Sequence, residues 1–182
     1  MNIVQRVAAA VALSLATLTS GTAIVAPQEL QRAVITAGLA VLTPEMEGTK
    51  FKAYRDMGGV WTICTGHTGG VRAGDRATPE ECAAYFRGDV TEVVDFIWRR
   101  VTGQISFLCK VAIGDFGINV GTTALGKSTL LVKANAGDQR GVANEFLRWT
   151  WVDGKDCKVS GSYCPGIVAR RVIQRDLCLV GL

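Results

Sequence analysis

Two acidic residues and one threonine stand in an order that could break a glycosidic bond. Such a reaction needs a protonated carboxyl group at the leaving oxygen and an ionised carboxylate on the opposite face of the sugar. Glu47 follows an apolar segment, and partial burial there would favour its protonated form. Asp56 stands beside Arg55 and near glycines, so we expect it to stay ionised, while Thr62 could hold the attacking water through its hydroxyl group.

A hairpin is expected to carry two of these residues. Gly58-Gly59 separates two runs of aromatic and β-branched residues, which predicts a β-hairpin. Asp56 would lie just before its turn and Thr62 on its second strand. The spacing by itself is equally typical of a helix cap and a solvated turn residue.

A helix should position Glu47. Apolar residues recur at helical spacing within residues 29–46, where Pro44 disturbs the end of the pattern. A hairpin folded back toward this helix end would aim Glu47, Asp56 and Thr62 at one cleft.

Most of the remaining chain is expected to be helical. Thr78 and Glu81 form a capping-box pattern around Pro79, which predicts a helix from there to about Trp98. Further helices are expected over 104–119, 128–135 and 138–149, and from Pro165 onward. The predicted fold class is therefore α+β, with a small β-hairpin lobe, a larger helical lobe and a groove between them, which suits a long polymer.

Several conspicuous side chains have ordinary structural interpretations. We expect His67 to pack behind the hairpin and to bond a neighbouring acid. Trp149 and Trp151 could stack on sugars, but aromatic residues near helix ends more often belong to the core. Three basic residues of the last helix are expected to form its solvated face: Arg170, Arg171 and Arg175.

Composition restricts the partners and the compartment. The 182 residues carry a formal net charge of +4 and no Gly-rich phosphate loop, which disfavours nucleic acid and suits an anionic polymer or cell envelope. Six cysteines indicate disulfides and an oxidising compartment. With one histidine and no Cys-x-x-Cys pair, we expect neither a metal nor a cofactor.

The N-terminal segment is unusual. Residues 7–28 contain no charged residue, a length of 22 residues that could cross a bilayer, but Ala, Ser, Thr and Gly dominate it. It could be a cleaved signal peptide, with Gly21-x-Ala23 as the cleavage site, or a retained and weak anchor. Either would carry the following residues across the inner membrane and leave Arg6 on the cytoplasmic side.

The run around the two acids resembles the phage-type lysozymes (glycoside hydrolase family 24). Their signature is Glu, eight residues, Asp or Cys, five residues and Thr, and Glu47, Asp56 and Thr62 match it in type and spacing. The resemblance extends over residues 34 to 181. Other matching segments follow in order: Gly66-His67-Thr68, Asn119-Val120-Gly121, Ser128-Thr129-Leu130-Leu131, Arg148-Trp149 and Pro165-Gly166-Ile167-Val168.

This resemblance implies a monomeric, lysozyme-like muramidase domain over residues 29–182. It implies hydrolysis of the β-1,4 bond between N-acetylmuramic acid and N-acetylglucosamine of peptidoglycan, with inversion at the anomeric carbon. Glu47 would be the acid, and Asp56 and Thr62 would act on the water. A lytic transglycosylase is the closest alternative, because it breaks the same bond with one acid; a chitinase and a membrane-disrupting envelope binder are the others.

The N-terminal segment also resembles those of the signal-arrest-release endolysins. In such enzymes a weakly hydrophobic helix holds the protein inactive in the host inner membrane until release into the periplasm. The resemblance implies this role for residues 1–28, with an N-terminal hydrophobic helix over 7–28. We expect activation by refolding around Glu47 once this segment leaves the bilayer.

The sequence departs from the family pattern at its cysteines. Cys64 replaces a glycine found in many members, and residues 155–164 add a small loop. The two cysteines of this loop are expected to pair with each other. For the other four cysteines the sequence leaves the pairing open. The expected pairs are Cys157 with Cys164, Cys64 with Cys82, and Cys109 with Cys178.

Overall fold

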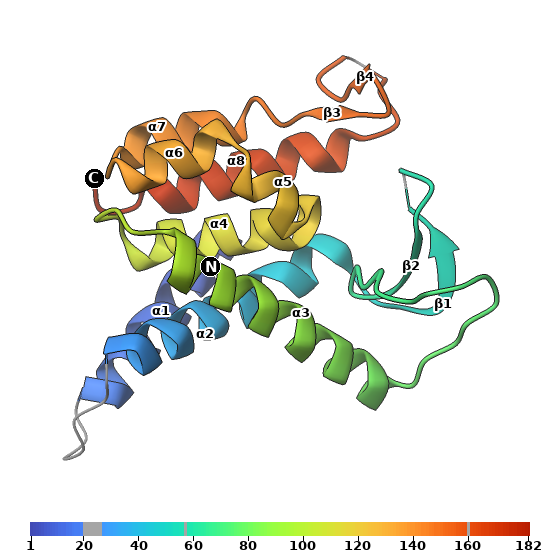
Figure 1. Cartoon of the computed structure of the whole chain (residues 1–182), viewed down its shortest axis with the longest axis horizontal. Coiled ribbons are helices and arrows are strands. Elements are labelled where there is room, and N and C mark those ends of the chain that lie inside the picture. Colours follow the sequence, from blue (N-terminus) through green and yellow to red (C-terminus); the bar gives the residue numbers. More distant parts are fainter. Residues whose placement is uncertain (20–26, 57, 160) are drawn as a thin grey trace.

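A helical bundle makes up most of the chain, and a small hairpin lobe lies at one end of it (Figure 1). The structure is a computed structural model that describes residues 1–19, 27–56, 58–159 and 161–182. The helices are α1 (Ile3–Thr19), α2 (Pro27–Glu47), α3 (Pro79–Arg100), α4 (Phe107–Val120), α5 (Thr122–Gly126), α6 (Thr129–Asn135), α7 (Gln139–Phe146) and α8 (Pro165–Leu179). The strands are β1 (Lys50–Arg55), β2 (Trp61–Cys64), β3 (Trp151–Val152) and β4 (Lys155–Asp156). The predicted combination of a hairpin lobe with a larger helical lobe is confirmed.

The core is built around α4, which packs against α2, α3 and α8. Val111, Ile113 and Phe116 are fully buried, and buried residues occur on all sides of this helix. A helix that is apolar all round is expected at the centre of a bundle. Phe116 meets Phe146 and Trp149 edge-on, with ring centroids 5.5 and 5.0 Å apart. The C-terminal end of α4 is therefore held firmly where it reaches the groove described below.

The predicted capping box at the start of α3 is confirmed. The Thr78 hydroxyl accepts from the Glu81 backbone N–H at 3.2 Å, and Glu81 Oε2 accepts from the Thr78 N–H at 2.7 Å. These bonds satisfy two backbone donors that the first turn of a helix leaves free. The helix continues to Arg100 and connects the hairpin lobe to the bundle (Figure 1).

The hairpin has the predicted position. β1 pairs antiparallel with β2, and Tyr54 stands opposite Thr62. Asp56 starts the turn, its N–H donating to the Val60 carbonyl at 2.9 Å. Gly59 has a φ of +75°, a conformation that glycine adopts without steric cost. The Gly-Gly pair thus places Asp56 at the turn and returns the chain to Thr62.

The prediction for the last helix is partly wrong. Arg170 and Arg171 were expected to face solvent, but α8 buries both. Of the three basic residues, only Arg175 lies partly exposed as expected. The reason is that α4 supplies charged and polar partners for the two arginines, and a buried charge is tolerated when it is paired and hydrogen-bonded.

The expected single hydrophobic helix over residues 7–28 is not supported. The structure has one helix, α1, over Ile3–Thr19 and begins α2 at Pro27, while residues 20–26 lie outside the described part of the chain. Among the described helices, none combines the length and the apolar character that crossing a membrane requires.

Helix α1 packs alongside α2 on the bundle (Figure 1). Val7 and Val11 are buried in the same core as α4. A Cβ atom on Gly38 of α2 would lie 2.5 Å from a methyl group of Val111, so only glycine permits this close approach of α2 to α4. Near the start of α1, Arg6 forms an ion pair of 2.9 Å with Glu45, which lies in the last turn of α2.

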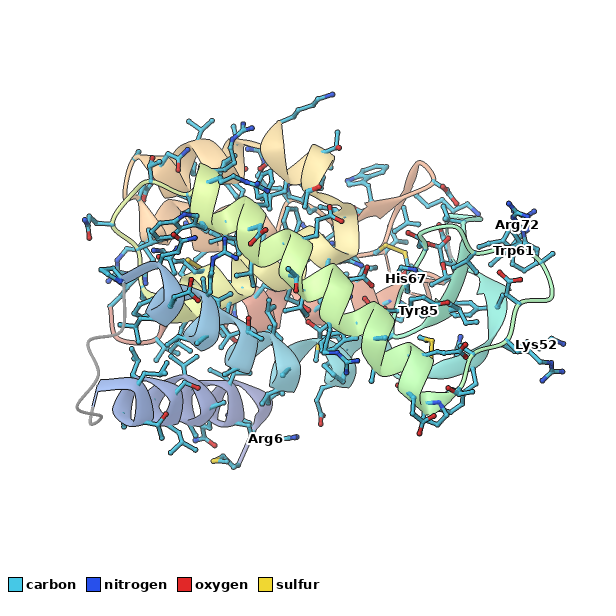
Figure 2. All side chains as sticks on the ribbon, turned by 60° about the horizontal axis from the view of Figure 1, so that its bottom comes forward. Arg6, Lys52, Trp61, His67, Arg72 and Tyr85 are labelled. Atoms are coloured by element: carbon cyan, nitrogen blue, oxygen red, sulfur yellow. A yellow bond between two sulfur atoms is a disulfide. The ribbon has the colours of Figure 1, made fainter. Side chains whose placement is uncertain are left out.

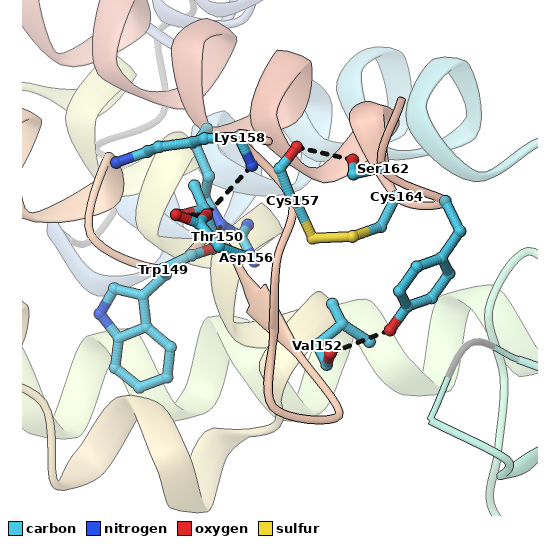
Figure 3. The surroundings of a disulfide bond; sticks show 10 residues. Trp149, Thr150, Val152, Asp156, Cys157, Lys158, Ser162 and Cys164 are labelled. Atoms are coloured by element: carbon cyan, nitrogen blue, oxygen red, sulfur yellow. Dashed lines mark hydrogen bonds between the residues drawn. A yellow bond between two sulfur atoms is a disulfide. The ribbon is translucent and has the colours of Figure 1, made fainter. Parts of the chain in front are cut away.

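Three disulfides connect the elements, in the three pairings expected from the sequence. The first joins β2 to α3, the second joins α4 to α8, and the third closes the loop that follows β4 (Figure 3). They are Cys64–Cys82, Cys109–Cys178 and Cys157–Cys164.

Candidate active site

A groove of about 690 Å³ lies between the hairpin lobe and the helical lobe. The three residues singled out from the sequence, Glu47, Asp56 and Thr62, all line it. Glu47 reaches it from the end of α2, whereas Asp56 and Thr62 reach it from the hairpin. The fold therefore brings the two carboxylates to one groove from separate elements.

Glu47 is the last residue of α2. The helix ends there because Gly48 adopts a φ of +65°. The Glu47 side chain is only 20% exposed, and its Oε1 accepts a hydrogen bond from Nη1 of Arg170. The carboxyl group is thus partly buried and held in place, with Oε2 as its remaining oxygen.

Arg170 joins Glu47 to the interior of the bundle. Its Nε and Nη2 donate to the two carboxylate oxygens of Asp115 at 2.9 and 2.8 Å. Burial alone would lower the pKa of Arg170, but the carboxylates of Asp115 and Glu47 outweigh burial and hold that pKa above its ordinary range. Arg170 therefore remains a cation beside Glu47 at every pH of interest.

The hairpin turn fixes Asp56. Its Oδ1 accepts from the Val60 N–H at 2.8 Å, in addition to the backbone bond between the same two residues. The Asp56 carboxylate is partly exposed and lines the groove. Its second oxygen is left to accept a hydrogen bond from water in the groove.

Thr62 is 3% exposed and lies at the floor of the groove. Its hydroxyl donates to the Val60 carbonyl at 3.1 Å, so this carbonyl engages the hydroxyl proton. The oxygen retains acceptor capacity for a water molecule. Thr62 can therefore receive a hydrogen bond from a water that Asp56 also approaches.

Tyr54 is a groove residue that sequence reasoning missed. It pairs with Thr62 across the hairpin, and burial, followed by the charges of Glu47 and Asp56, raises its pKa. The phenol consequently stays protonated and can donate a hydrogen bond between the two acids. Its place within the signature run was visible in the sequence, but a tyrosine on a strand is more often simply a packing residue.

The backbone of Gly66 packs against the side chain of Glu47. Its φ is +85°, and a Cβ atom would lie 3.4 Å from the Glu47 carboxyl carbon. We predict that Gly66→Ala lowers the free energy of unfolding by about 1–2 kcal/mol, because alanine is strained at positive φ. Urea denaturation would measure this loss.

Gly88 of α3 provides a matched control for Gly66. A Cβ atom there meets nothing within 4 Å, and the residue is exposed in the middle of a helix. Gly88→Ala should therefore raise the free energy of unfolding by about 0.5–1 kcal/mol. Equal destabilisation by both substitutions would contradict the assigned role of the Gly66 backbone.

His67 has the structural role expected from the sequence. Its Nδ1 lies 3.0 Å from both carboxylate oxygens of Asp89, and its ring stacks on Tyr85 with centroids 4.4 Å apart (Figure 2). Burial raises the pKa of Asp89, against a smaller opposing effect of the bond to His67. These contacts connect the segment after β2 to α3 and so stabilise the hairpin lobe.

Within the described ranges, no group of three or more His, Cys, Asp and Glu side chains is arranged to hold a metal ion.

The two candidate sugar-stacking tryptophans behave differently. Trp149 packs on the core against Phe116 and presents only part of its side chain to the groove. Trp151 on β3 also lines the groove but is 64% exposed. The Tyr163 hydroxyl donates to the Val152 carbonyl at 2.9 Å, and the neighbouring disulfide closes the same loop (Figure 3). Trp151 therefore stands on a braced hairpin at the edge of the groove.

Known proteins resemble this chain in sequence and in fold. The sequence model of the family described as Phage lysozyme matches residues 44–173. A SAR-endolysin of Bacteriophage PS119 is 36% identical over 137 residues, which cover 75% of this chain and 78% of that relative. The solved muramidase domain of SpmX from Asticaccaulis excentricus has a TM-score of 0.65 and 28% identity, covering 79% of this chain and 95% of that one. The active form of P1 phage endolysin Lyz shares the fold over 94% of each chain, with a TM-score of 0.63 and 22% identity.

A groove between a hairpin lobe and a helical lobe, with a carboxylate from each, defines a lysozyme-type glycosidase. The family match covers both lobes and includes all three residues of the signature run. The chain belongs to the phage lysozyme family. Its substrate class is accordingly the peptidoglycan of bacterial cell walls.

Proposed function

We propose that this protein is an endolysin that hydrolyses the β-1,4 bond between N-acetylmuramic acid and N-acetylglucosamine. The observation that carries the proposal is the placement of Glu47, on α2, and of Asp56 and Thr62, on the hairpin, along one groove. The names of the relatives, SAR-endolysin and muramidase domain, support the same activity.

In the proposed reaction Glu47 is the general acid. It donates a proton to the leaving oxygen as the bond from that oxygen to the anomeric carbon breaks. A water held by the Thr62 oxygen attacks the anomeric carbon from the opposite face, and Asp56 accepts the proton that this water loses. The product has the inverted configuration. The fixed position of the Glu47 carboxyl group, with Arg170 on one oxygen, leaves Oε2 to carry the transferred proton.

The product distinguishes hydrolysis from the transglycosylase alternative. Digestion of purified peptidoglycan in water enriched in oxygen-18, followed by mass spectrometry, should give muropeptides with reducing muramic acid ends that carry the heavy isotope. A transglycosylase would release 1,6-anhydro ends without the label, because an internal hydroxyl group replaces water. Anhydro ends as the main product would overturn the proposed reaction.

The edge of the groove gives a further prediction on this function. Trp151→Ala should raise the KM for cell walls about five-fold with little change in kcat, because a sugar ring stacked on an indole gains about 1 kcal/mol. Initial rates of wall clearance would measure both constants. Val159→Ala, which shortens an equally exposed apolar side chain in the disulfide-closed loop after β4, is the matched control and should leave KM unchanged. If both variants gave the same KM, Trp151 would have no contact with the glycan.

We also propose that the N-terminal segment first serves as a membrane anchor and later joins the folded enzyme. The uncharged run over residues 7–28 and the relatives named SAR-endolysins support the first part. Support for the second is the packing of α1, in which Arg6 pairs with Glu45, two residues before Glu47. An Arg6 retained on the cytoplasmic side could not make this pair with a periplasmic α2. Release would thus bring the protein from the inner membrane into the periplasm and complete the support of α2.

Increasing the hydrophobicity of the segment tests this anchor. The variant Ser20→Leu, Gly21→Leu and Thr22→Leu should remain in the membrane fraction after depolarisation and should delay lysis, because leucine strongly favours the bilayer over water. The same three positions changed to alanine are the control and should release normally. Lysis on schedule by the leucine variant would contradict the anchor.

A further inference from the structure

Asp115 is a fully buried carboxylate that the proposed reaction does not use. It lies in α4, is 0% exposed and has Arg170 along one side in a two-bond contact. The Thr43 hydroxyl donates to its Oδ1 at 3.1 Å, and Gln174 Nε2 donates to its Oδ2 at 2.7 Å. Each oxygen thus accepts two hydrogen bonds, one of them from the Arg170 guanidinium group, so the buried carboxylate is fully paired.

Arg170 is shared between this buried carboxylate and the proposed acid. Nε and Nη2 face Asp115, with Nη2 also near the Asp115 carbonyl at 3.3 Å, and Nη1 faces Glu47. A cation in contact with a carboxyl group favours loss of its proton. A general acid must instead keep its proton until the leaving oxygen takes it. The contact with Arg170 would therefore oppose catalysis if the charge of Arg170 were not balanced.

We propose that Asp115 is a positioning residue that neutralises Arg170, so that Glu47 is held by the guanidinium group without losing its proton to it. The Asp115–Arg170 pair then presents a donor in fixed geometry but little net positive charge. This inference rests on the proposed role of Glu47 as the acid.

The other charges around Glu47 make this balance necessary. A second cation, Arg171, lies next in α8, where its Nη2 donates to Asn119 Oδ1 at 2.6 Å and its Nη1 to Gln174 Oε1 at 2.9 Å. Burial, and then the Arg170 charge, lower the pKa of Arg171 to about 10, which still leaves it cationic at neutral pH. Without Asp115, Glu47 would face two buried guanidinium groups. The charged or titratable groups around it are Arg170 and Arg171 of α8, Asp115 of α4, Tyr54 and Lys50 of β1, Asp56 of the turn and Glu45 of α2.

The alkaline limb of the pH–activity profile reports the proton on the acid. In Asp115→Asn the amide keeps the size of the side chain but removes its charge, so Glu47 should lose its proton more easily. The alkaline limb of kcat/KM on purified cell walls should move about one unit or more toward lower pH. The acidic limb, which reports the base, should move less.

A second variant should move the same limb the other way. Asn119 lines the groove, and its Oδ1 already accepts from Arg171, so Asn119→Asp adds a negative charge without removing a hydrogen bond. Its alkaline limb should shift toward higher pH. Because this variant leaves Asp115 in place, it tests the charge balance even where Asp115→Asn folds poorly.

Opposite shifts of the two variants are the expected result. Alkaline limbs that coincide with that of the unaltered protein, or shifts of the same sign, would overturn the role of Asp115. Loss of rate without a change in either limb would indicate packing alone. These outcomes are separate from failure of the proposed function, which would appear as full activity of Glu47→Gln.

Discussion

Glu47→Gln should lower kcat on purified cell walls by about a thousand-fold or more, a loss typical of removing a general acid. The substitution keeps the shape of the side chain and an oxygen that can accept from Arg170, but it removes the proton that the leaving oxygen needs. The release of reducing sugar ends from isolated walls measures the rate without interference from membranes. A membrane-disrupting protein would lyse cells equally well with this variant.

Glu45→Gln is the matched control for Glu47→Gln. Glu45 lies in the same final turn of α2, but its side chain is 45% exposed and it pairs with Arg6 at the surface. Exposed ion pairs contribute little stability, so this variant should retain activity within about two-fold. More than a tenth of the original activity in Glu47→Gln would remove Glu47 from the proposed reaction.

Removal of the Cys109–Cys178 disulfide should cause the largest loss of stability. It joins the first turn of α4 to the end of α8 across 69 residues of sequence, and both cysteines are fully buried. Constraining a loop of this length stabilises the fold by about 4 kcal/mol through the entropy of the unfolded chain. The double variant Cys109→Ala and Cys178→Ala should therefore melt about 10 °C lower or more in a calorimetric scan.

The Cys157–Cys164 disulfide offers a comparison of the same chemistry over a short loop. Its cysteines are separated by 7 residues, so its removal should cost about 2.5 kcal/mol by the same relation. Replacing Cys157 and Cys164 by alanine should consequently lower the melting temperature less than the first pair. A reversed order would show that loop length does not govern these disulfides.

The local features of the site could be predicted because local residues encode them. The Gly-Gly pair determines the hairpin turn, and the turn determines where Asp56 and Thr62 lie. The capping box at Thr78 is likewise contained in four consecutive residues. Such signals depend on backbone conformation and side-chain hydrogen bonds within one turn, so they do not depend on residues that are distant in the sequence.

The buried charges of α8 could not be predicted in this way. A periodic pattern assigns arginines to the solvent face, because most charged side chains stay in water. Arg170 is buried since Asp115, 55 residues earlier, meets it in the folded bundle. Nothing in the spacing of either residue indicates that contact, and the same holds for the influence of two acids on Tyr54.

The structure of the N-terminal segment could not be predicted from its local composition either. Its lack of charge predicted one hydrophobic helix for residues 7–28, whereas α1 ends at Thr19 and buries Val7 and Val11 against the bundle. A face rich in alanine and valine is apolar enough to pack on a protein core, so composition alone does not separate that use from insertion into lipid.

The configuration of the first product tests the account most directly. Proton NMR during hydrolysis of a soluble peptidoglycan oligosaccharide distinguishes the two anomers before they interconvert. With Glu47 as acid and Asp56 acting through water, the α-anomer should appear first and the β-anomer should accumulate only later. Initial release of the β-anomer would mean that a retaining reaction takes place in this groove, and it would contradict the proposed roles of Glu47, Asp56 and Thr62.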